Sequence, residues 1–266
     1  MHYFEHKVIW ITGASSGIGK ETAIALSKIP HVSLIVSARR EDKLLEVKNI
    51  CIDNGAACEI LLLDLEQTQE LESKAQKALS LFNRIDILIN NGGISQRSSV
   101  EETPIENDRK IMEIDYFSSV ILTKTLLPRM IAQKSGHIVP ISSISGIFGF
   151  PLRSAYCAAK HAMYGFYEAL DIEMRTKGIA VTIVAPGRIQ TDISYSALTK
   201  DGTAHGKLDA GQELGMPVDV CVRKMLKAIS KKKHEALIGR KELIMAHLYR
   251  KLPCLFHFIV GKIKAT

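Results

Sequence analysis

The stretch Lys7-Val-Ile-Trp-Ile-Thr12-Gly13-Ala14-Ser15-Ser16-Gly17-Ile18-Gly19 joins a short apolar run to a glycine cluster. The apolar run predicts a buried parallel strand, and the apolar spacing after Gly17 predicts a helix. Glycines at such a turn let the backbone approach a pyrophosphate, and the helix N-terminus offers free N–H groups and the positive end of its dipole. We therefore expect a dinucleotide to contact Gly13, Ser15, Ser16, Gly17, Ile18 and Gly19.

Apolar runs and amphipathic stretches alternate along the rest of the chain. Strands are expected at 7–12, 31–38, 58–64, 85–90, 137–142, 179–185 and 235–238. Helices are expected at 17–29, 41–50, 66–82, 105–133, 154–177 and 217–231. This alternation predicts the α/β class, as a three-layer, doubly wound Rossmann-type fold with a seven-stranded parallel sheet. Pro140 lies inside a predicted central strand and removes a ladder donor, so we expect a local irregularity there.

One domain over residues 1–266 is the economical prediction, because no repeat or low-complexity linker interrupts the pattern. Segment 191–216 is rich in Ser, Thr, Gly and Asp and has weak periodicity. It is expected to leave the sheet and form a lid over a substrate pocket. Residues 240–266 form a tail of mixed basic and apolar residues, divided by Pro253.

The second predicted strand ends in Ala38-Arg39-Arg40. An acidic residue here would bind the adenine-ribose hydroxyl and favour NAD, but none occurs before Glu41. Arginines suit a 2′-phosphate, which a guanidinium grips with two hydrogen bonds. The pair therefore favours NADP over NAD, although two arginines can also simply open a charged helix on the surface.

Three side chains suggest acid–base chemistry. Tyr156 and Lys160 are four residues apart on a predicted helix, so they share one face. A nearby ammonium favours the phenolate and lowers the tyrosine pKa. Ser143 follows the carboxyl end of a predicted strand, the edge where open α/β sheets bind ligands. Taken singly, these residues are equally typical of a serine-rich turn, a core aromatic and a surface charge.

Together these motifs resemble the short-chain dehydrogenase/reductase family over residues 7–192. The glycine-rich turn is similar to its cofactor turn, and Asn90-Asn91-Gly92-Gly93 to its N-N-A-G segment, with Gly92 where alanine is usual. Tyr156-x-x-x-Lys160 follows Ser143 at the family's spacing, and Pro186-Gly187 resembles the family's P-G motif. The nearest branch holds hydroxysteroid dehydrogenases and related dehydrogenase/reductases. Members often carry an N-terminal membrane anchor, which we do not expect here.

The resemblance implies a role for each matching position. Tyr156 would exchange a proton with a carbonyl or alcohol, with Ser143 and Lys160 as partners, and Lys160 would also bind the nicotinamide ribose. The remaining cofactor contacts would come from Asp64 and the Leu65 backbone at the adenine, Asn90 beside the adenosine, Gly92, Pro186 and Gly187 in the loops that match the family motifs, and Ile189 and Thr191 at the carboxamide.

One catalytic position departs from the family pattern. Asp115 stands where the family has an asparagine that helps to hold a water linking the lysine to solvent. Aspartate accepts the same hydrogen bonds but cannot donate as an amide does, and when ionised it favours a charged lysine. We expect activity to survive with an altered pH dependence. The alternative is a catalytically impaired sensor or scaffold that binds NADP(H).

The substrate is expected to be a small apolar carbonyl compound or secondary alcohol, because four apolar residues follow Ser143. They are Ile144, Ile147, Phe148 and Phe150, which are equally typical of ordinary core.

Charge and cysteine content narrow the possible partners. The net charge is +7, but residues 221–266 carry +10 and residues 1–220 carry −3. The basic tail suggests either packing on the body or a second subunit, or a peripheral contact with an anionic membrane. We expect no nucleic-acid partner, since no reading module accompanies the charge. The five cysteines lack metal-site spacing, so no metal is expected. A cytoplasmic homodimer or homotetramer is predicted.

Overall fold

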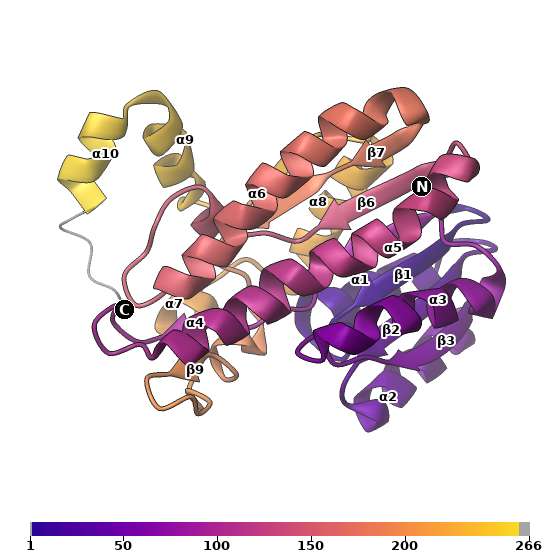
Figure 1. The fold of residues 1–266 in the computed structure, drawn as a ribbon, viewed down its shortest axis with the longest axis horizontal. Helices are drawn as coiled ribbons and strands as arrows, with labels where there is room; N and C mark the ends of the chain where they lie inside the picture. Colours follow the sequence, from indigo (N-terminus) through magenta and orange to yellow (C-terminus); the bar gives the residue numbers. More distant parts are fainter. Residues whose placement is uncertain (1, 261–266) are drawn as a thin grey trace.

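The fold consists of a parallel sheet between two layers of helices (Figure 1). It is known from a computed structural model, which describes residues 2–260. The main sheet has the order β3-β2-β1-β4-β6-β7, and β8 pairs with β10. The strands of these sheets are β1 (Val8–Thr12), β2 (Ser33–Ala38), β3 (Ala57–Leu62), β4 (Ile87–Asn90), β6 (Gly136–Pro140), β7 (Ile179–Val181), β8 (Ile183–Pro186) and β10 (Glu235–Ile238).

The helices cover both faces of the sheet. The helices of the described residues are α1 (Gly17–Ser27), α2 (Glu41–Asp53), α3 (Leu71–Phe82), α4 (Ile105–Met112), α5 (Ser118–Ala132), α6 (Ser154–Met174), α7 (Ala210–Glu213), α8 (Val218–Ser230), α9 (Leu243–Lys251) and α10 (Pro253–Val260), of which α1, α2 and α8 pack on one face and α3, α5 and α6 on the other. Short 3₁₀ turns η1 (His2–Phe4), η2 (Thr68–Glu70), η4 (Ile144–Gly146), η5 (Arg175–Lys177) and η6 (Asp192–Ser194) connect them.

The central strand β1 is buried on both sides, and its side chains alternate between two cores. Ile9 and Ile11 pack with the side chains of α1, α2 and α8. Val8 and Trp10 pack with those of α3, α5 and α6. Successive side chains of a strand point to opposite faces, so an unbroken apolar run is what a doubly covered strand requires. The predicted α/β class and doubly wound arrangement are confirmed.

Pro140 produces the expected irregularity at a specific place. The Thr182 amide donates to the Ile138 carbonyl, and the Ser142 amide donates to the Val184 carbonyl. Pro140 lies between these two rungs and has no N–H to donate. The single strand predicted at 179–185 is accordingly split at Thr182 into β7 and β8, and the Ile141–Val184 bridge links the pieces to the same sheet. If β7 and β8 are counted as one strand, β10 joins the main sheet through β8. The sheet then has the seven strands expected.

The helix expected at 105–133 contains a π-helical turn. It runs as α4, a π segment η3 (Glu113–Phe117) and α5. Single π turns inside α-helices insert one residue and are frequent at functional sites. Asp115 lies within this turn and is buried. The departure from the family pattern and the distortion of the helix therefore coincide.

Segment 191–216 runs outside the main sheet. It contains η6, the short strand β9 (Leu198–Thr199) and α7. Strand β9 pairs in parallel with β5 (Gln96–Arg97), which follows β4. The segment is thus fastened to the loop that leaves the centre of the sheet.

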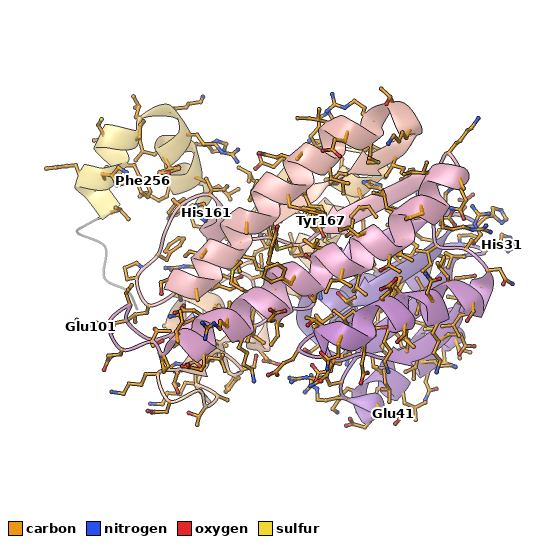
Figure 2. The ribbon with its side chains drawn as sticks, viewed as in Figure 1. His31, Glu41, Glu101, His161, Tyr167 and Phe256 are labelled. Carbon is orange, nitrogen blue, oxygen red and sulfur yellow. The ribbon has the colours of Figure 1, made fainter. Side chains whose placement is uncertain are left out.

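The C-terminal tail folds as the helix pair α9 and α10, which lies beside the body (Figure 1). Ala246 and Phe256 are buried, and the Phe256 ring lies 4.9 Å from that of Phe148 and 5.1 Å from that of Tyr249. Figure 2 marks Phe256 within this pair. The tail therefore packs on the body along one face. Its residues 261–266 lie outside the described part, and within residues 2–260 no helix has the length and apolarity to cross a membrane.

We predict that Phe256→Ala releases α10 from the body. Truncating a buried phenylalanine costs about 3 kcal/mol because it removes apolar contacts and leaves a cavity. Hydrogen exchange of the amides in α10 would measure the lost protection. Leu252→Ala, at a position that is 55% exposed, is the matched control and should change protection little. Equal effects of the two substitutions would contradict this assignment.

Candidate active site

A cavity of about 830 Å³ opens at the carboxyl ends of the strands. Most residues predicted for the cofactor and the chemistry line it, and they come from separate loops. They are Gly13, Ser15, Ser16, Gly17, Ile18, Arg39, Arg40, Asp64, Leu65, Gly92, Asp115, Ser143, Tyr156, Lys160, Pro186, Gly187, Ile189 and Thr191. The structure therefore gathers at one edge residues that are spread over much of the chain.

The glycine-rich turn is held against the loop after β4. Gly13 has φ +65°, and a Cβ there would lie 2.7 Å from Gly92 Cα, so only glycine fits this close approach. The Asn91 side-chain amide donates to the carbonyl oxygens of Thr12 (3.0 Å) and Gly13 (3.2 Å). Thr12 Oγ1 accepts from the amides of Asn91 and Gly92, both at 3.0 Å. The backbone that faces the cavity is thus fixed by polar contacts behind it.

Two predicted cofactor residues do not line the cavity. Asn90 is 3% exposed, and its amide donates to Thr123 Oγ1 and Tyr167 Oη, both at 3.1 Å, between β4 and the helices. A Cβ on Gly19 would lie 2.4 Å from the Gly13 carbonyl oxygen, so Gly19 serves the packing of α1 on the turn. Asn90 and Gly19 therefore have structural partners, and their contacts with a cofactor stay predictions.

Gly92 also has a local reason to differ from the usual alanine. A Cβ on Gly92 would lie 2.4 Å from Leu65 Cδ1. Leu65 itself lines the cavity, at the end where the resemblance places the adenine. The glycine therefore leaves room for the neighbouring leucine side chain.

Arg39 and Arg40, the two arginines after β2, line the cavity. Both are exposed. Arg40 donates to Ser15 Oγ at 3.2 Å, which ties the end of β2 to the glycine-rich turn. Their guanidinium groups thus border the same space as the turn that is expected to hold a pyrophosphate.

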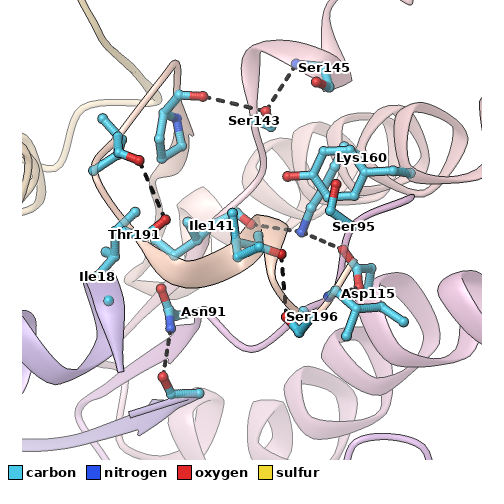
Figure 3. A pocket seen from close by; sticks show the side chains of 18 of the residues that line it. Ile18, Asn91, Ser95, Asp115, Ile141, Ser143, Ser145, Lys160, Thr191 and Ser196 are labelled. Carbon is cyan, nitrogen blue, oxygen red and sulfur yellow. Dashed lines mark hydrogen bonds and ion pairs between the residues drawn. The ribbon is translucent and has the colours of Figure 1, made fainter. Parts of the chain in front are cut away.

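Ser143, Tyr156 and Lys160 meet in the same cavity, and Figure 3 shows Ser143 and Lys160 there. Lys160 Nζ lies 5.5 Å from the centroid of the Tyr156 ring. Ser143 Oγ accepts from the Ser145 amide at 3.1 Å and donates to the Pro186 carbonyl at 3.4 Å. The sequence spacing therefore does bring these three side chains together.

Asp115 forms a buried ion pair with Lys160. Asp115 Oδ2 lies 3.0 Å from Lys160 Nζ, and both side chains are at most 5% exposed. The Ile94 amide donates to Asp115 Oδ1 at 2.8 Å, and Lys160 Nζ donates to the Ile141 carbonyl at 3.2 Å. The π turn carries the carboxylate to the ammonium, where the family pattern has a neutral amide (Figure 3).

The electrostatic balance at Tyr156 differs from the sequence expectation. Burial raises the pKa of Tyr156; Lys160 lowers that pKa and Asp115 raises it, and the net direction is upward. Burial lowers the pKa of Lys160, but the attraction of Asp115 and Tyr156 outweighs burial and raises it overall. The predicted lowering of the tyrosine pKa by Lys160 is present, but burial and Asp115 together exceed it.

Some cavity residues gave no signal in the sequence. Arg97, Arg153 and Asp209 line the cavity and contact one another, although they come from three distant segments. A lone charged residue in a loop is usually a surface residue, so only the fold reveals such a cluster. Among residues 2–260, no three His, Cys, Asp or Glu side chains are grouped as metal ligands.

Comparison with known proteins gives the same assignment as the motifs. The sequence profile described as short chain dehydrogenase matches residues 7–201. Dehydrogenase/reductase SDR family member 7 of Mus musculus is 42% identical over 252 residues, covering 92% of this chain and 74% of that protein. The Homo sapiens protein of the same name is 41% identical over 261 residues, covering 96% and 77%.

Solved structures agree in fold. A short chain dehydrogenase/reductase from Burkholderia phymatum in complex with NAD has a TM-score of 0.83 at 20% identity, covering 100% of this chain and 98% of that one. A short-chain dehydrogenase from Streptomyces avermitilis has a TM-score of 0.77 at 27% identity, covering 95% and 96%. The sequence match and the structural likeness together show that the chain belongs to the short-chain dehydrogenase/reductase family.

Proposed function

We propose that this chain is an NADP(H)-dependent oxidoreductase that acts on an apolar carbonyl compound or secondary alcohol, with Tyr156 as the acid/base. One observation carries the proposal. Tyr156, Lys160 and Ser143 share a cavity with the glycine-rich turn, so proton transfer and a dinucleotide have room in one space. The family membership supports the same reaction class.

The residues of the cavity fit a nicotinamide dinucleotide. The turn around Gly13 leaves no space for a Cβ and presents bare backbone, which suits a pyrophosphate. Asp64 and Leu65 would hold the adenine end, and Ile189 and Thr191 the nicotinamide end. When bound, the cofactor supplies or accepts the hydride, while the protein supplies orientation and electrostatics.

The chain's own groups handle the proton and the substrate oxygen. In reduction, the Tyr156 hydroxyl donates a proton to the developing alkoxide, and in oxidation the phenolate accepts it from the alcohol. The Ser143 hydroxyl donates a hydrogen bond to the same oxygen. The Lys160 ammonium stabilises the phenolate, and Asp115 in turn holds that ammonium in place.

Preference for NADP rests on Arg39 and Arg40. Both arginines line the cavity and are exposed, so their guanidinium groups can reach a doubly charged phosphate. The NAD in the Burkholderia structure belongs to that protein.

Further properties are inferred from the family resemblance and the tail. We infer that segment 191–216 closes over the substrate, and that the chain assembles as a cytoplasmic homodimer or homotetramer. The tail leaves Ile244, Leu252 and Leu255 exposed beside basic residues, which supports a peripheral contact with an anionic membrane.

Tyr156→Phe is expected to lower kcat by about 10²- to 10⁴-fold, the usual range for losing a general acid/base, while NADPH binding persists. Steady-state rates with a panel of apolar ketones and aldehydes, together with NADPH titrations, test this. Tyr164→Phe makes the same chemical change on the same helix, at a hydroxyl that bonds Glu235 at 2.7 Å, and should leave the rate intact. Tight NADPH binding without turnover of any panel compound would favour the sensor alternative.

Arg39→Ser and Arg40→Ser should each weaken NADPH binding by about tenfold or more, because a charge-assisted hydrogen bond to the phosphate is lost. NADH binding should change little, since NADH lacks that phosphate. Fluorescence titration with both cofactors measures the ratio. Lys43→Met, at an exposed cation of α2 paired with Glu46, is the control. Equal losses for NADPH and NADH would contradict the NADP assignment.

Asp115→Asn is expected to shift the pH profile of alcohol oxidation to lower pH. Oxidation needs the Tyr156 phenolate, so the rate rises as pH passes the tyrosine pKa. Asp115 raises the pKa of Tyr156, and removing its charge therefore lowers that pKa. The measurement is kcat/KM against pH for both proteins. A native enzyme that is inert until the amide is restored would refute the expectation that Asp115 supports activity.

A further inference from the structure

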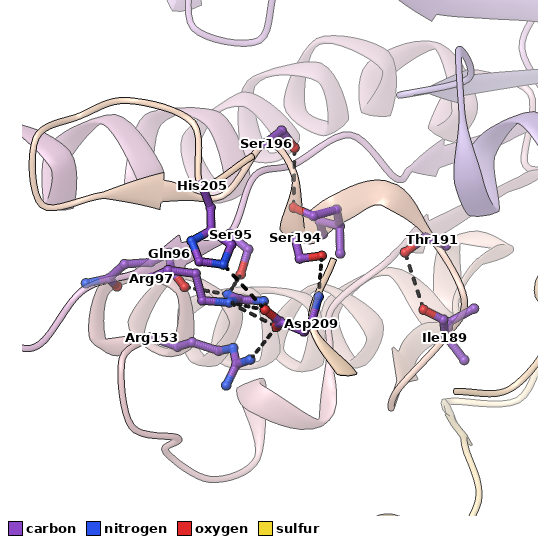
Figure 4. A network of polar contacts seen from close by, with 11 residues as sticks. Ser95, Gln96, Arg97, Arg153, Ile189, Thr191, Ser194, Ser196, His205 and Asp209 are labelled. Atoms are coloured by element: carbon purple, nitrogen blue, oxygen red, sulfur yellow. Dashed lines mark hydrogen bonds and ion pairs between the residues drawn. The ribbon is translucent and has the colours of Figure 1, made fainter. Parts of the chain in front are cut away.

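A cluster of charged side chains lies in the cavity, where two arginines share the carboxylate of Asp209 from segment 191–216 (Figure 4). Arg97 Nε donates to Asp209 Oδ2 at 3.0 Å, and an Arg153 terminal nitrogen donates to the same oxygen at 3.1 Å. Arg97 comes from β5, Arg153 immediately precedes α6, and Asp209 immediately precedes α7. The cluster is therefore assembled by the fold and not by any local motif.

The guanidinium groups of Arg97 and Arg153 differ in how many of their N–H donors are hydrogen-bonded. The Arg97 guanidinium also bonds Ser95 Oγ at 2.9 Å and the Gln96 carbonyl oxygen. Within residues 2–260, Asp209 is the single hydrogen-bond or ion-pair partner of the Arg153 guanidinium. Arginine carries five N–H donors, so most donors of Arg153 are left for a ligand.

The cluster also carries an excess of positive charge. Two guanidinium groups face one carboxylate. His205 lies 3.8 Å from Asp209 and, when protonated, adds a further positive charge. The Arg153 side chain is 21% exposed, so water screens this charge poorly. Burial and then Arg97 lower the pKa of Arg153 by more than Asp209 and its other neighbours raise it. A partly buried cation without its own counterion favours an incoming anion.

The position of Arg153 points to the substrate. Arg153 immediately precedes α6, Tyr156 lies in the first turn of that helix, and both residues line the cavity. The apolar residues Ile144, Phe148 and Phe150 line the same space. A molecule with an apolar body therefore has room to meet the tyrosine with one group and the arginine with another.

We propose that Arg153 is a specificity-determining residue that binds a carboxylate of the substrate. The substrate class is then an apolar carbonyl compound or alcohol that also bears a carboxylate. The reaction rests on the proposed function, whereas binding of the carboxylate does not.

Calorimetric titration of the full chain, saturated with NADPH, with octanoate and octanamide tests the binding. Octanoate is expected to bind about tenfold tighter or better, since a charge-assisted pair replaces a neutral contact. Arg153→Met should abolish the difference, and Arg153→Lys should retain part of it. Arg175→Met, at the exposed Arg175–Asp171 pair just beyond the far end of α6, is the control and should keep the difference.

Asp209→Asn distinguishes a ligand-binding role of the cluster from a purely structural role. Removing the internal carboxylate frees both guanidinium groups, so the affinity for octanoate should rise. If the ion pairs only hold segment 191–216 in place, both ligands should bind more weakly to this variant. Equal affinity for the two ligands in the native chain, or an unchanged preference in Arg153→Met, would overturn the proposal.

Turnover of a medium-chain keto acid and its amide then distinguishes the two inferences. If the amide is reduced and the acid is no better a substrate, the carboxylate site fails while the reaction stands. If neither is reduced and octanoate binds through Arg153, the proposed reaction fails while the site stands.

Discussion

Every strand of the main sheet runs in the same direction, so the carboxyl ends of all strands lie at one edge. This constraint determines where the candidate active site lies. The glycine-rich turn follows β1, the arginine pair follows β2, Gly92 follows β4 and Ser143 follows β6. No one of these loops forms a site alone. The edge brings them together, and the helices behind it provide Asp115, Tyr156 and Lys160.

A second constraint is electrostatic. The lysine that must stabilise a phenolate is buried with a carboxylate at 3.0 Å. Burial of a lone ammonium is costly, and the carboxylate offsets that cost. The same carboxylate opposes the phenolate, so the charge that keeps the lysine ionised also reduces the help that the lysine gives to Tyr156. The π turn in the helix is what places this carboxylate within reach.

The sequence predicted the order of strands and helices well, because a doubly covered parallel sheet requires apolar runs and amphipathic helices with clear periods. The split of one strand at Thr182 followed from Pro140, whose missing N–H is visible in the sequence. The π turn at Asp115 was not predicted, since a one-residue insertion shifts the phase of the apolar pattern by about 100° but leaves the helical period on each side unchanged. The cavity residues named in advance were found there, except Asn90 and Gly19, because motif spacing fixes a loop and not the direction of each side chain. The Arg97–Asp209–Arg153 cluster required the fold itself.

The helices α9 and α10 contribute Met245 and Val260 to the wall of the cavity, although the family profile ends at residue 201. A part of the cavity wall thus lies outside the segment that the family profile matches. Selection on the substrate can act on the C-terminal helices while the nucleotide turn and the tyrosine stay fixed. Related proteins that are alike over the profile can therefore differ in substrate preference through their last few dozen residues.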